Sequence, residues 1–407
     1  MFGQKTKKEE SIQEPISLLY IFGVFLKLGC TAFGGYMSLV AMVQKQLVEI
    51  DKRLKEEDLL DGISLTSMLP GPVAVNIIAY VGYRLRGIKG AILAFLGIII
   101  PSFFLVLLLS WMYKTYGSLP VVKNFFLGIT LAITALILTV AMGMAKKNMK
   151  EPSQWIIGFV SMCLLIFIGG IVTTFFIIIG SGIVGYVLFH KRQQVVAANI
   201  ERQGDKMSPK QWAWSAIIGL LLLSLLLFGG QNMGNILPLQ IASTFSGISL
   251  TLFGGGYVVI PTLHELFVDN LGWLTSSEFA DGIAIGQITP GPIFITATFI
   301  GYHVAGITGA IIATISIFTP PAVLTVLLSR SVDVVRNSSV MKSVLLGIRP
   351  AVIGMIFASA YTIGKTMDME IKSILVFLIL FYVSYKFKIS PIILILGSGV
   401  LGLILYL

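Results

Sequence analysis

Long runs of apolar residues, separated by short polar loops, make up most of this chain of 407 residues. The runs Ala91–Tyr113 and Trp212–Phe228 are close to or above the about 20 residues that a helix needs to cross a hydrocarbon core about 30 Å thick. The first half contains six such apolar segments, near residues 17–43, 59–83, 90–113, 125–145, 154–168 and 172–189. This pattern predicts an all-α integral membrane protein.

The second half of the chain repeats the first at an offset of about 220 residues. Asp61 and Pro70-Gly71-Pro72 correspond to Asp281 and Pro290-Gly291-Pro292. After the loss of one residue, Gly82 and Gly128 correspond to Gly301 and Gly347. Near the end of each half, GSGIVG (Gly180–Gly185) resembles GSGVLG (Gly397–Gly402). Glycines and prolines repeated in the same order predict two related halves, residues 16–189 and 231–407.

The remaining segments complete the predicted domain organisation. Residues 1–15 lack the apolar core of a signal peptide, and we expect a cytoplasmic tail there. Residues 190–230 combine a basic loop with a linking transmembrane helix, 212–228, that matches nothing in the first half. Six segments in each half and this linking helix give about thirteen apolar helices. Because six crossings and one more end on the opposite side, the second half is predicted to be inverted.

The charges agree with a membrane protein of this topology. Only 12% of residues are charged, 56% are hydrophobic, and the net charge is +10. Lysines and arginines lie in short loops between apolar segments, so the charge predicts topology rather than binding to nucleic acid. The richest basic loops of the first half are the three that would be cytoplasmic if the N-terminus is inside, at 84–89, 146–150 and 190–210. We therefore expect a multi-pass protein of a bacterial inner membrane with a cytoplasmic N-terminus.

The loops of the second half support the inversion, with two exceptions along the chain. The loop after Tyr302 corresponds to the loop at 84–89 but contains no Lys or Arg, as an extracytoplasmic loop should. Two loops do not follow the rule. The predicted outer loop 44–58 is basic, and the predicted inner loop 264–280 has no Lys or Arg.

Pro-Gly-Pro interrupts the second apolar segment of each half. Proline removes a backbone donor and glycine weakens a helix, so each motif predicts a break. Irregular backbone at membrane depth persists only within protein or beside a polar cavity. Pro72 and Pro292 suit the first turn of a new half-helix, whose N–H groups carry partial positive charge and bind anions. Matching broken helices in inverted halves predict that the two ends meet at the midplane around one compact anion. A simple packing kink is the alternative.

Small polar side chains flank both breaks. Hydroxyl and amide groups suit an oxyanion that must be released again, although Ser and Thr also join membrane helices. The candidate substrate-binding residues, including those of the breaks themselves, are Thr66, Ser67, Pro70, Gly71, Pro72 and Asn76 in the first half and Gln287, Thr289, Pro290, Gly291, Pro292 and Thr296 in the second.

Glycine pairs interrupt the first apolar segment of each half. Gly34-Gly35 and Gly254-Gly255 would let another backbone approach the cavity, or permit tight helix packing. We include them among the candidate substrate-binding residues, and we expect the first segment to be discontinuous as well.

A few charged side chains lie within the apolar segments. Lys27 lies before Gly34, where its ammonium would attract the anion; snorkelling to the surface is the alternative. Asp61 and Asp281 precede the two breaks and are candidates for coupling to an ion such as a proton, or for capping their helices.

The sequence offers no metal or cofactor site. The sequence has three histidines, His190, His264 and His303, and their positions do not match the spacing of metal ligands. We expect them to lie at the membrane interface. Cys30 and Cys163 both fall within apolar segments, so neither a disulfide framework nor a cysteine metal site is expected.

The motifs identify a family resemblance. KLGCTAFGG, LPGP and GYRLRGIKGA in the first half, and LFGGGYVVIP, WLTSSEFADGIAIGQITPGP and GYHVAGITGA in the second, resemble the chromate ion transporter family in its full-length, two-domain form. The resemblance covers nearly the whole chain. It implies two oppositely oriented homologous halves and extrusion of chromate from the bacterial cytoplasm, which confers chromate resistance.

Several functions remain in competition. A secondary active transporter that exports chromate is the leading hypothesis, and a permease for sulfate or another oxyanion, by import or exchange, is the nearest alternative. A lipid-modifying enzyme would need Asp-rich or His-rich motifs within the spans, and a scaffold would not need duplicated breaks. The expected partners are an oxyanion and the lipid bilayer, with a coupling ion and a homodimer left open.

Overall fold

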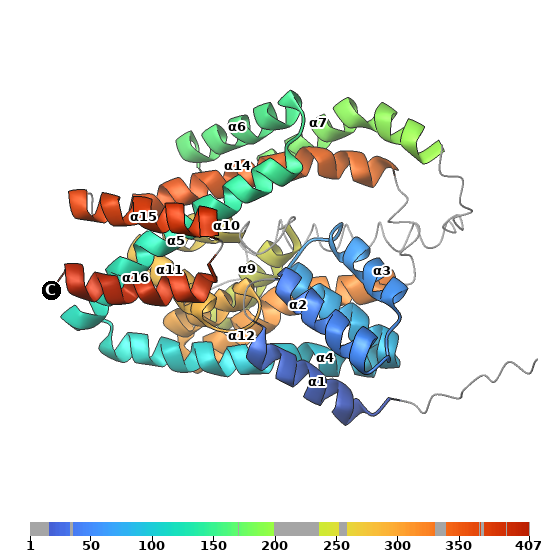
Figure 1. Ribbon diagram of the computed structural model, residues 1–407, viewed down its shortest axis with the longest axis horizontal. Coiled ribbons are helices and arrows are strands. Elements are labelled where there is room, and N and C mark those ends of the chain that lie inside the picture. Colours follow the sequence, from blue (N-terminus) through green and yellow to red (C-terminus); the bar gives the residue numbers. More distant parts are fainter. Residues whose placement is uncertain are drawn as a thin grey trace, which may run out of the picture.

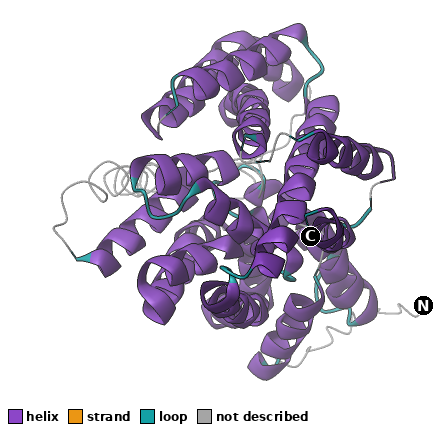
Figure 2. Ribbon diagram, turned by 90° about the vertical axis from the view of Figure 1, so that its left-hand side faces the viewer, coloured by secondary structure: helices purple, strands orange, loops and turns teal. Residues whose placement is uncertain are grey.

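The structure is a computed structural model that describes residues 16–32, 36–169, 171–198, 236–251, 259–329, 339–365, 367, 370–387 and 389–406. Within these residues all regular elements are helices (Figure 2). The predicted tail at 1–15, the linking helix at 212–228 and the glycine pairs Gly34-Gly35 and Gly254-Gly255 lie outside them.

The helices of the two halves follow the same order (Figure 1). The first half contains α1 (Leu18–Thr31), α2 (Tyr36–Val43) with a π-helical continuation (Gln44–Ile50), α3 (Glu56–Thr66), α4 (Val73–Tyr116), α5 (Pro120–Asn148), α6 (Pro152–Phe167) and α7 (Ile171–Ala198). The second contains α9 (Leu237–Thr251), α10 (Val259–His264) with a π-helical continuation (Glu265–Asn270), α11 (Ser276–Ile288), a 3-10 turn (Ile293–Ile295), α12 (Thr296–Leu328), α14 (Ser339–Gly364), α15 (Ile371–Phe387) and α16 (Pro391–Leu405).

Four of the described helices are long and apolar enough to cross a membrane: α4, α5, α12 with its preceding 3-10 turn, and α14. Several shorter helices, among them α1, α6 and α16, are apolar as well. The prediction of a membrane protein built from apolar helices is therefore supported by the structure.

The second apolar segment of each half is a hairpin, which corrects our expectation that it crosses the membrane. A Cβ atom added to Gly62 would contact the ring of Tyr80, and Arg84 forms an ion pair with Asp58. Each pair is placed evenly around Gly71, so α3 and the start of α4 run back alongside each other. These arms of 11 and 13 residues are about 17 and 20 Å long, too short to cross about 30 Å.

The second half forms the same hairpin around Gly291. Gly282 faces the ring of Phe299, and Glu278 lies beside His303. The break that the sequence predicts at each Pro-Gly-Pro is confirmed, but it lies at the tip of a hairpin and not at the middle of a crossing. Hydropathy does not distinguish the two arrangements, because the arms are equally apolar in both.

The first apolar segment of each half folds in the same way. Tyr20 in α1 donates a hydrogen bond to Asp51, just after the π-helical continuation of α2. In the second half, the rings of Phe245 in α9 and Phe267 are 4.9 Å apart. The described ends of each segment therefore lie together, and the number of full crossings is lower than thirteen.

A sharp turn divides α4 and α12 into a hairpin arm and a longer helix. Arg86 and Ala305 leave the helical conformation, and the glycines that follow them, Gly87 and Gly306, have φ values of 58° and 61°. We refer to the helices after these turns as the long parts of α4 and α12.

The last three helices of each half pack against the opposite half. In Figure 1, α14 runs beside α6 and α7, whereas α15 and α16 lie beside α5. The repeated GSG motifs make these contacts possible. A Cβ at Gly128 of α5 would overlap the backbone of Ser398 and Gly402 in α16, and a Cβ at Gly347 of α14 would overlap that of Ser181 and Gly185 in α7. Close approach of small residues holds the two halves together.

We predict that Gly128→Ala destabilises the protein by about 1–3 kcal/mol, because the added methyl group has no room between α5 and α16. Gly143→Ala is the matched control: it lies on the same helix, and a Cβ there meets nothing within 4 Å. Thermal unfolding of the detergent-solubilised variants measures the effect. Equal transition temperatures would show that the two helices do not pack this closely.

Candidate functional site

The tips of the two Pro-Gly-Pro hairpins each pack against the opposite half. Gly71 and Gly291 have φ values of 99° and 114°, a backbone region that only glycine adopts without strain. A Cβ at Gly71 would overlap Pro321 in α12, and a Cβ at Gly291 would overlap Ser102 in α4. Ser102 and Pro321 correspond in the repeat, so the two contacts are equivalent.

Each tip also reaches the first hairpin of the other half. The N–H of Gly291 donates a 2.9 Å hydrogen bond to the carbonyl of Ala32, directly after α1. A Cβ at Gly71 would lie 3.3 Å from the carbonyl oxygen of Ser249, near the end of α9. Ser102 lies halfway along the long part of α4, so the Gly291 tip and the end of α1 meet at the middle of that helix.

Most of the predicted hydroxyl ligands donate to their own helices. The hydroxyl groups of Thr66 and Ser67 donate to the carbonyls of Gly62 and Ile63 at 2.8 and 2.6 Å. Those of Thr289 and Thr296 donate to the carbonyls of Gly286 and Ile293 at 2.9 and 3.0 Å. In this arrangement their hydrogens are not available to an anion.

Asn76 shapes the first tip. Its side-chain amide donates to the carbonyl of Pro70 at 3.1 Å, which holds the break in place. The other amide atom, Oδ1, is buried and has no hydrogen-bond partner in the described structure. Gln287 is 9% exposed and precedes the second tip by one turn.

Lys27 lies on an exposed position of α1, and its backbone carbonyl accepts a hydrogen bond from Thr31. Lys27 is five residues before Ala32, which contacts the Gly291 tip, and its role in attracting the anion stays a prediction.

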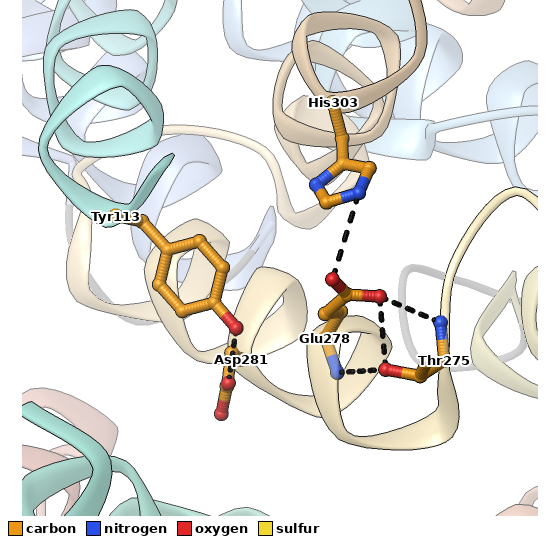
Figure 3. A network of polar contacts seen from close by, with 5 residues as sticks. All are labelled: Tyr113, Thr275, Glu278, Asp281 and His303. Carbon is orange, nitrogen blue, oxygen red and sulfur yellow. Dashed lines mark hydrogen bonds and ion pairs between the residues drawn. The ribbon is translucent and has the colours of Figure 1, made fainter. Parts of the chain in front are cut away.

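An acid–base pair joins the two arms of each Pro-Gly-Pro hairpin at its open end, which we call the mouth. Asp58 pairs with Arg84 in the first half, and Glu278 lies 3.6 Å from His303 in the second. The paired positions correspond in the repeat. Glu278 also caps α11 together with Thr275, whose N–H donates to the carboxylate at 2.8 Å (Figure 3). The prediction that His303 is a lone interfacial residue missed this contact.

Asp281 forms a contact between the halves that the sequence did not indicate. The hydroxyl of Tyr113, near the end of α4, donates to its carboxylate at 2.7 Å (Figure 3). Asp281 is 6% exposed, whereas the corresponding Asp61 is half-buried. The repeat could not reveal Tyr113, because Val332 stands at the corresponding position.

The two mouths lie at opposite ends of the long part of α4. At its start, Arg86 donates to the carbonyl of Ile16 at 2.7 Å, beside the mouth of the first half. At its end, Tyr113 reaches Asp281, and the ammonium of Lys114 lies 5.8 Å from the ring centre of Tyr302. This helix of 29 residues is about 43 Å long, enough to separate the two sides of a membrane.

A separate small cavity of about 30 Å³ lies between α6, α10 and α14. His264, Glu265 and Asp269 line it, and His264 Nδ1 is 3.2 Å from a carboxylate oxygen of Asp269. His264 is buried, contrary to the expectation of an interfacial residue. Two carboxylates make this cavity unsuitable for an oxyanion, so we place the candidate substrate site at the hairpin tips.

Comparison with known proteins gives one family over both halves. The family described as chromate transporter matches residues 19–186 and 239–403. An uncharacterized transporter of Methanocaldococcus jannaschii is 31% identical over 399 residues, which cover 98% of this chain and 96% of the relative. No solved structure matches the chain.

Two further relatives carry a named substrate. A probable chromate transport protein of Synechococcus elongatus is 30% identical over 399 residues, or 96% of either chain. A chromate transport protein of Cupriavidus metallidurans is 28% identical over 390 residues, which cover 94% of this chain and 92% of the relative. The family consists of transporters and not enzymes. This chain, matched by the family along both halves, belongs to the chromate transporter family.

Proposed function

We propose that this protein is a secondary active transporter of an inorganic oxyanion, with export of chromate from the cytoplasm as its activity. The observation that carries the proposal is the pair of glycine tips, each packed against a long helix of the opposite half. The first N–H groups of a helix have no partner within it and favour an anion. The names of two relatives support chromate as the substrate.

Flux measurements in everted membrane vesicles test the substrate. Uptake of labelled chromate that exceeds uptake of sulfate and molybdate would support chromate export. A preference for sulfate would favour the alternative, a sulfate permease. Absence of flux for all three anions would contradict the proposal.

We also propose that the two halves are inverted in the membrane, with the N-terminus in the cytoplasm. The separation of the two mouths along the long part of α4 supports this arrangement. The hairpins further support it, because they remove the two exceptions in the loop charges. A hairpin returns to the side from which it entered. The basic loop 44–58 therefore becomes cytoplasmic, and loop 264–280, which has no Lys or Arg, becomes extracytoplasmic, as the rule expects.

Single cysteines at Lys89 and Thr308 test the inversion. Both positions are exposed, they correspond in the repeat, and each follows the turn of α4 or α12. In a background without Cys30 and Cys163, we expect a membrane-impermeant thiol reagent to label Lys89→Cys from the cytoplasmic side alone and Thr308→Cys from the outer side alone. Labelling of both from one side would refute the inversion.

The transport site, in this proposal, is shared by both Pro-Gly-Pro tips. Pro70, Gly71 and Pro72 form one tip, and Pro290, Gly291 and Pro292 the other. Gly34-Gly35 and Gly254-Gly255, which lie outside the described residues, stay candidate substrate-binding residues on the grounds of the sequence. Lys27 stays a candidate for attracting the anion from its exposed position on α1.

Gly71→Ala and Gly291→Ala test whether the tips act as one unit. Either methyl group would overlap the opposite half, so we expect oxyanion flux to fall at least about tenfold in each variant and little further in the double variant. Gly87→Ala is the control, because its φ is also positive but a Cβ there meets nothing within 4 Å. Flux is normalised to protein in the membrane. Half of the activity in each single variant would indicate two independent sites.

We propose Asp281 as the residue that couples transport to a proton. Its burial and its hydrogen bond to Tyr113 across the halves support this role, since a buried carboxylate is a natural proton acceptor. Asp61 is the other candidate, in the first half.

Asp281→Asn should keep oxyanion exchange but lose accumulation driven by a pH gradient, because the amide cannot take up the proton. Tyr113→Phe should weaken the coupling less, and Asp61→Asn tests the corresponding residue. Proteoliposomes with and without an imposed gradient provide the measurement. Gradient-driven accumulation by Asp281→Asn at the wild-type level would exclude this carboxylate, and its loss only in Asp61→Asn would move the role to the first half.

A further inference from the structure

Ser102 is the polar side chain of the opposite half that lies against Gly291, at the tip of the second Pro-Gly-Pro hairpin. It is fully buried, with 0% of its surface exposed, and its hydroxyl has no hydrogen-bond partner in the part of the chain that the structure describes. Its position halfway along the long part of α4 is the point where the Gly291 tip meets the end of α1. Sequence reasoning missed Ser102 because it is 30 residues from the Pro-Gly-Pro of its own half, whereas the tip that it contacts belongs to the other half.

An unpaired hydroxyl is unusual for this protein. Most other buried hydroxyls on the described helices donate to a carbonyl one turn earlier, and only Thr174 and Thr262 share with Ser102 the lack of a partner within the described residues. Ser110, two turns after Ser102 on the same helix, donates to Val106 at 2.7 Å, and Thr325 on α12 donates to Pro321 at 2.9 Å. Buried polar groups are nearly always paired, so an exception points to a partner outside the chain.

The direction of the hydroxyl points to Gly291. The atom nearest to a Cβ built on Gly291 is Ser102 Oγ, so the hydroxyl occupies the space beside the glycine. The N–H of Gly291 is already bonded to Ala32, which fixes the tip next to it. A ligand at this tip would therefore meet an oriented hydroxyl group on α4.

The equivalent position at the other tip carries no hydroxyl. Gly71 packs against Pro321, the counterpart of Ser102, and a proline side chain has no hydrogen-bonding atom. Of these two equivalent positions, only Ser102 therefore offers a hydrogen-bond donor.

We propose that Ser102 donates its hydroxyl to the transported oxyanion, which places the binding position at the Gly291 tip rather than evenly between the two tips. This inference rests on the proposed function. A hydroxyl supplies one directed hydrogen bond without a charge, so it holds an oxyanion strongly enough to select it and weakly enough to release it.

The test compares Ser102→Ala with Ser110→Ala in proteoliposomes, with chromate and sulfate as the probes. Both variants remove a buried serine hydroxyl from α4, but only one hydroxyl is free in the structure. We expect Ser102→Ala to raise the KM for the transported anion about tenfold, as loss of a hydrogen bond to a charged group does, while Ser110→Ala leaves it within about twofold. Protein yield and thermal stability without substrate should be unchanged in Ser102→Ala.

Pro321→Ala separates binding from packing, because it alters the equivalent contact at the other tip. A KM that rises only in Ser102→Ala, together with a smaller rise in melting temperature on addition of chromate or sulfate, supports the inference. Equal KM values for the two serine variants, or an equal rise in Pro321→Ala, would overturn it while wild-type flux still upholds the proposed function. Absence of flux in the wild type would end both.

Discussion

Every backbone N–H and C=O within a bilayer needs a partner from the protein, and the two Pro-Gly-Pro tips are where the described part of this chain meets that constraint. A helix break exposes several such groups at once. Asn76 satisfies the carbonyl of Pro70 within its own half, but further contacts come from the other half: Gly291 donates to Ala32, and Gly71 packs against Pro321 and approaches the carbonyl of Ser249. Each Pro-Gly-Pro tip therefore depends on the opposite half.

The same dependence explains the exchange of the last helices. α5 packs against α15 and α16, and α14 packs against α6 and α7. Separating the halves would therefore expose the glycines at these contacts, such as Gly128 and Gly347. Backbones that approach this closely leave little freedom to shift by small steps. Packed surfaces of this kind favour discrete arrangements, which alternating access to a midplane site needs.

The sequence was informative about backbone and less so about side chains. Glycine and proline spacing predicted the repeat, and both Pro-Gly-Pro breaks are confirmed. The hairpins were missed because two short apolar arms have the same hydropathy whether they continue or fold back; Asp58 and Arg84, an ion pair across a mouth, were the available signal. The hydroxyls of Thr66 and Thr296 looked free in the sequence, but helix carbonyls one turn away take their hydrogens. Tyr113 has no counterpart in the repeat, so only the fold could bring it to Asp281.

The halves are alike in framework and different in chemistry. The residues that set the backbone, Gly71 and Gly291, are the same, whereas the side chains around them diverge. Ser102 stands opposite Pro321 in the repeat, and Arg84 opposite His303. A symmetric framework gives two related conformations of similar energy, because each half can adopt the arrangement of the other. A direction of transport cannot come from that symmetry, since identical halves would have no preferred side for binding or release. In the inverted arrangement that we propose, the divergent side chains at the tips and mouths are therefore where affinity and coupling would differ between the two sides.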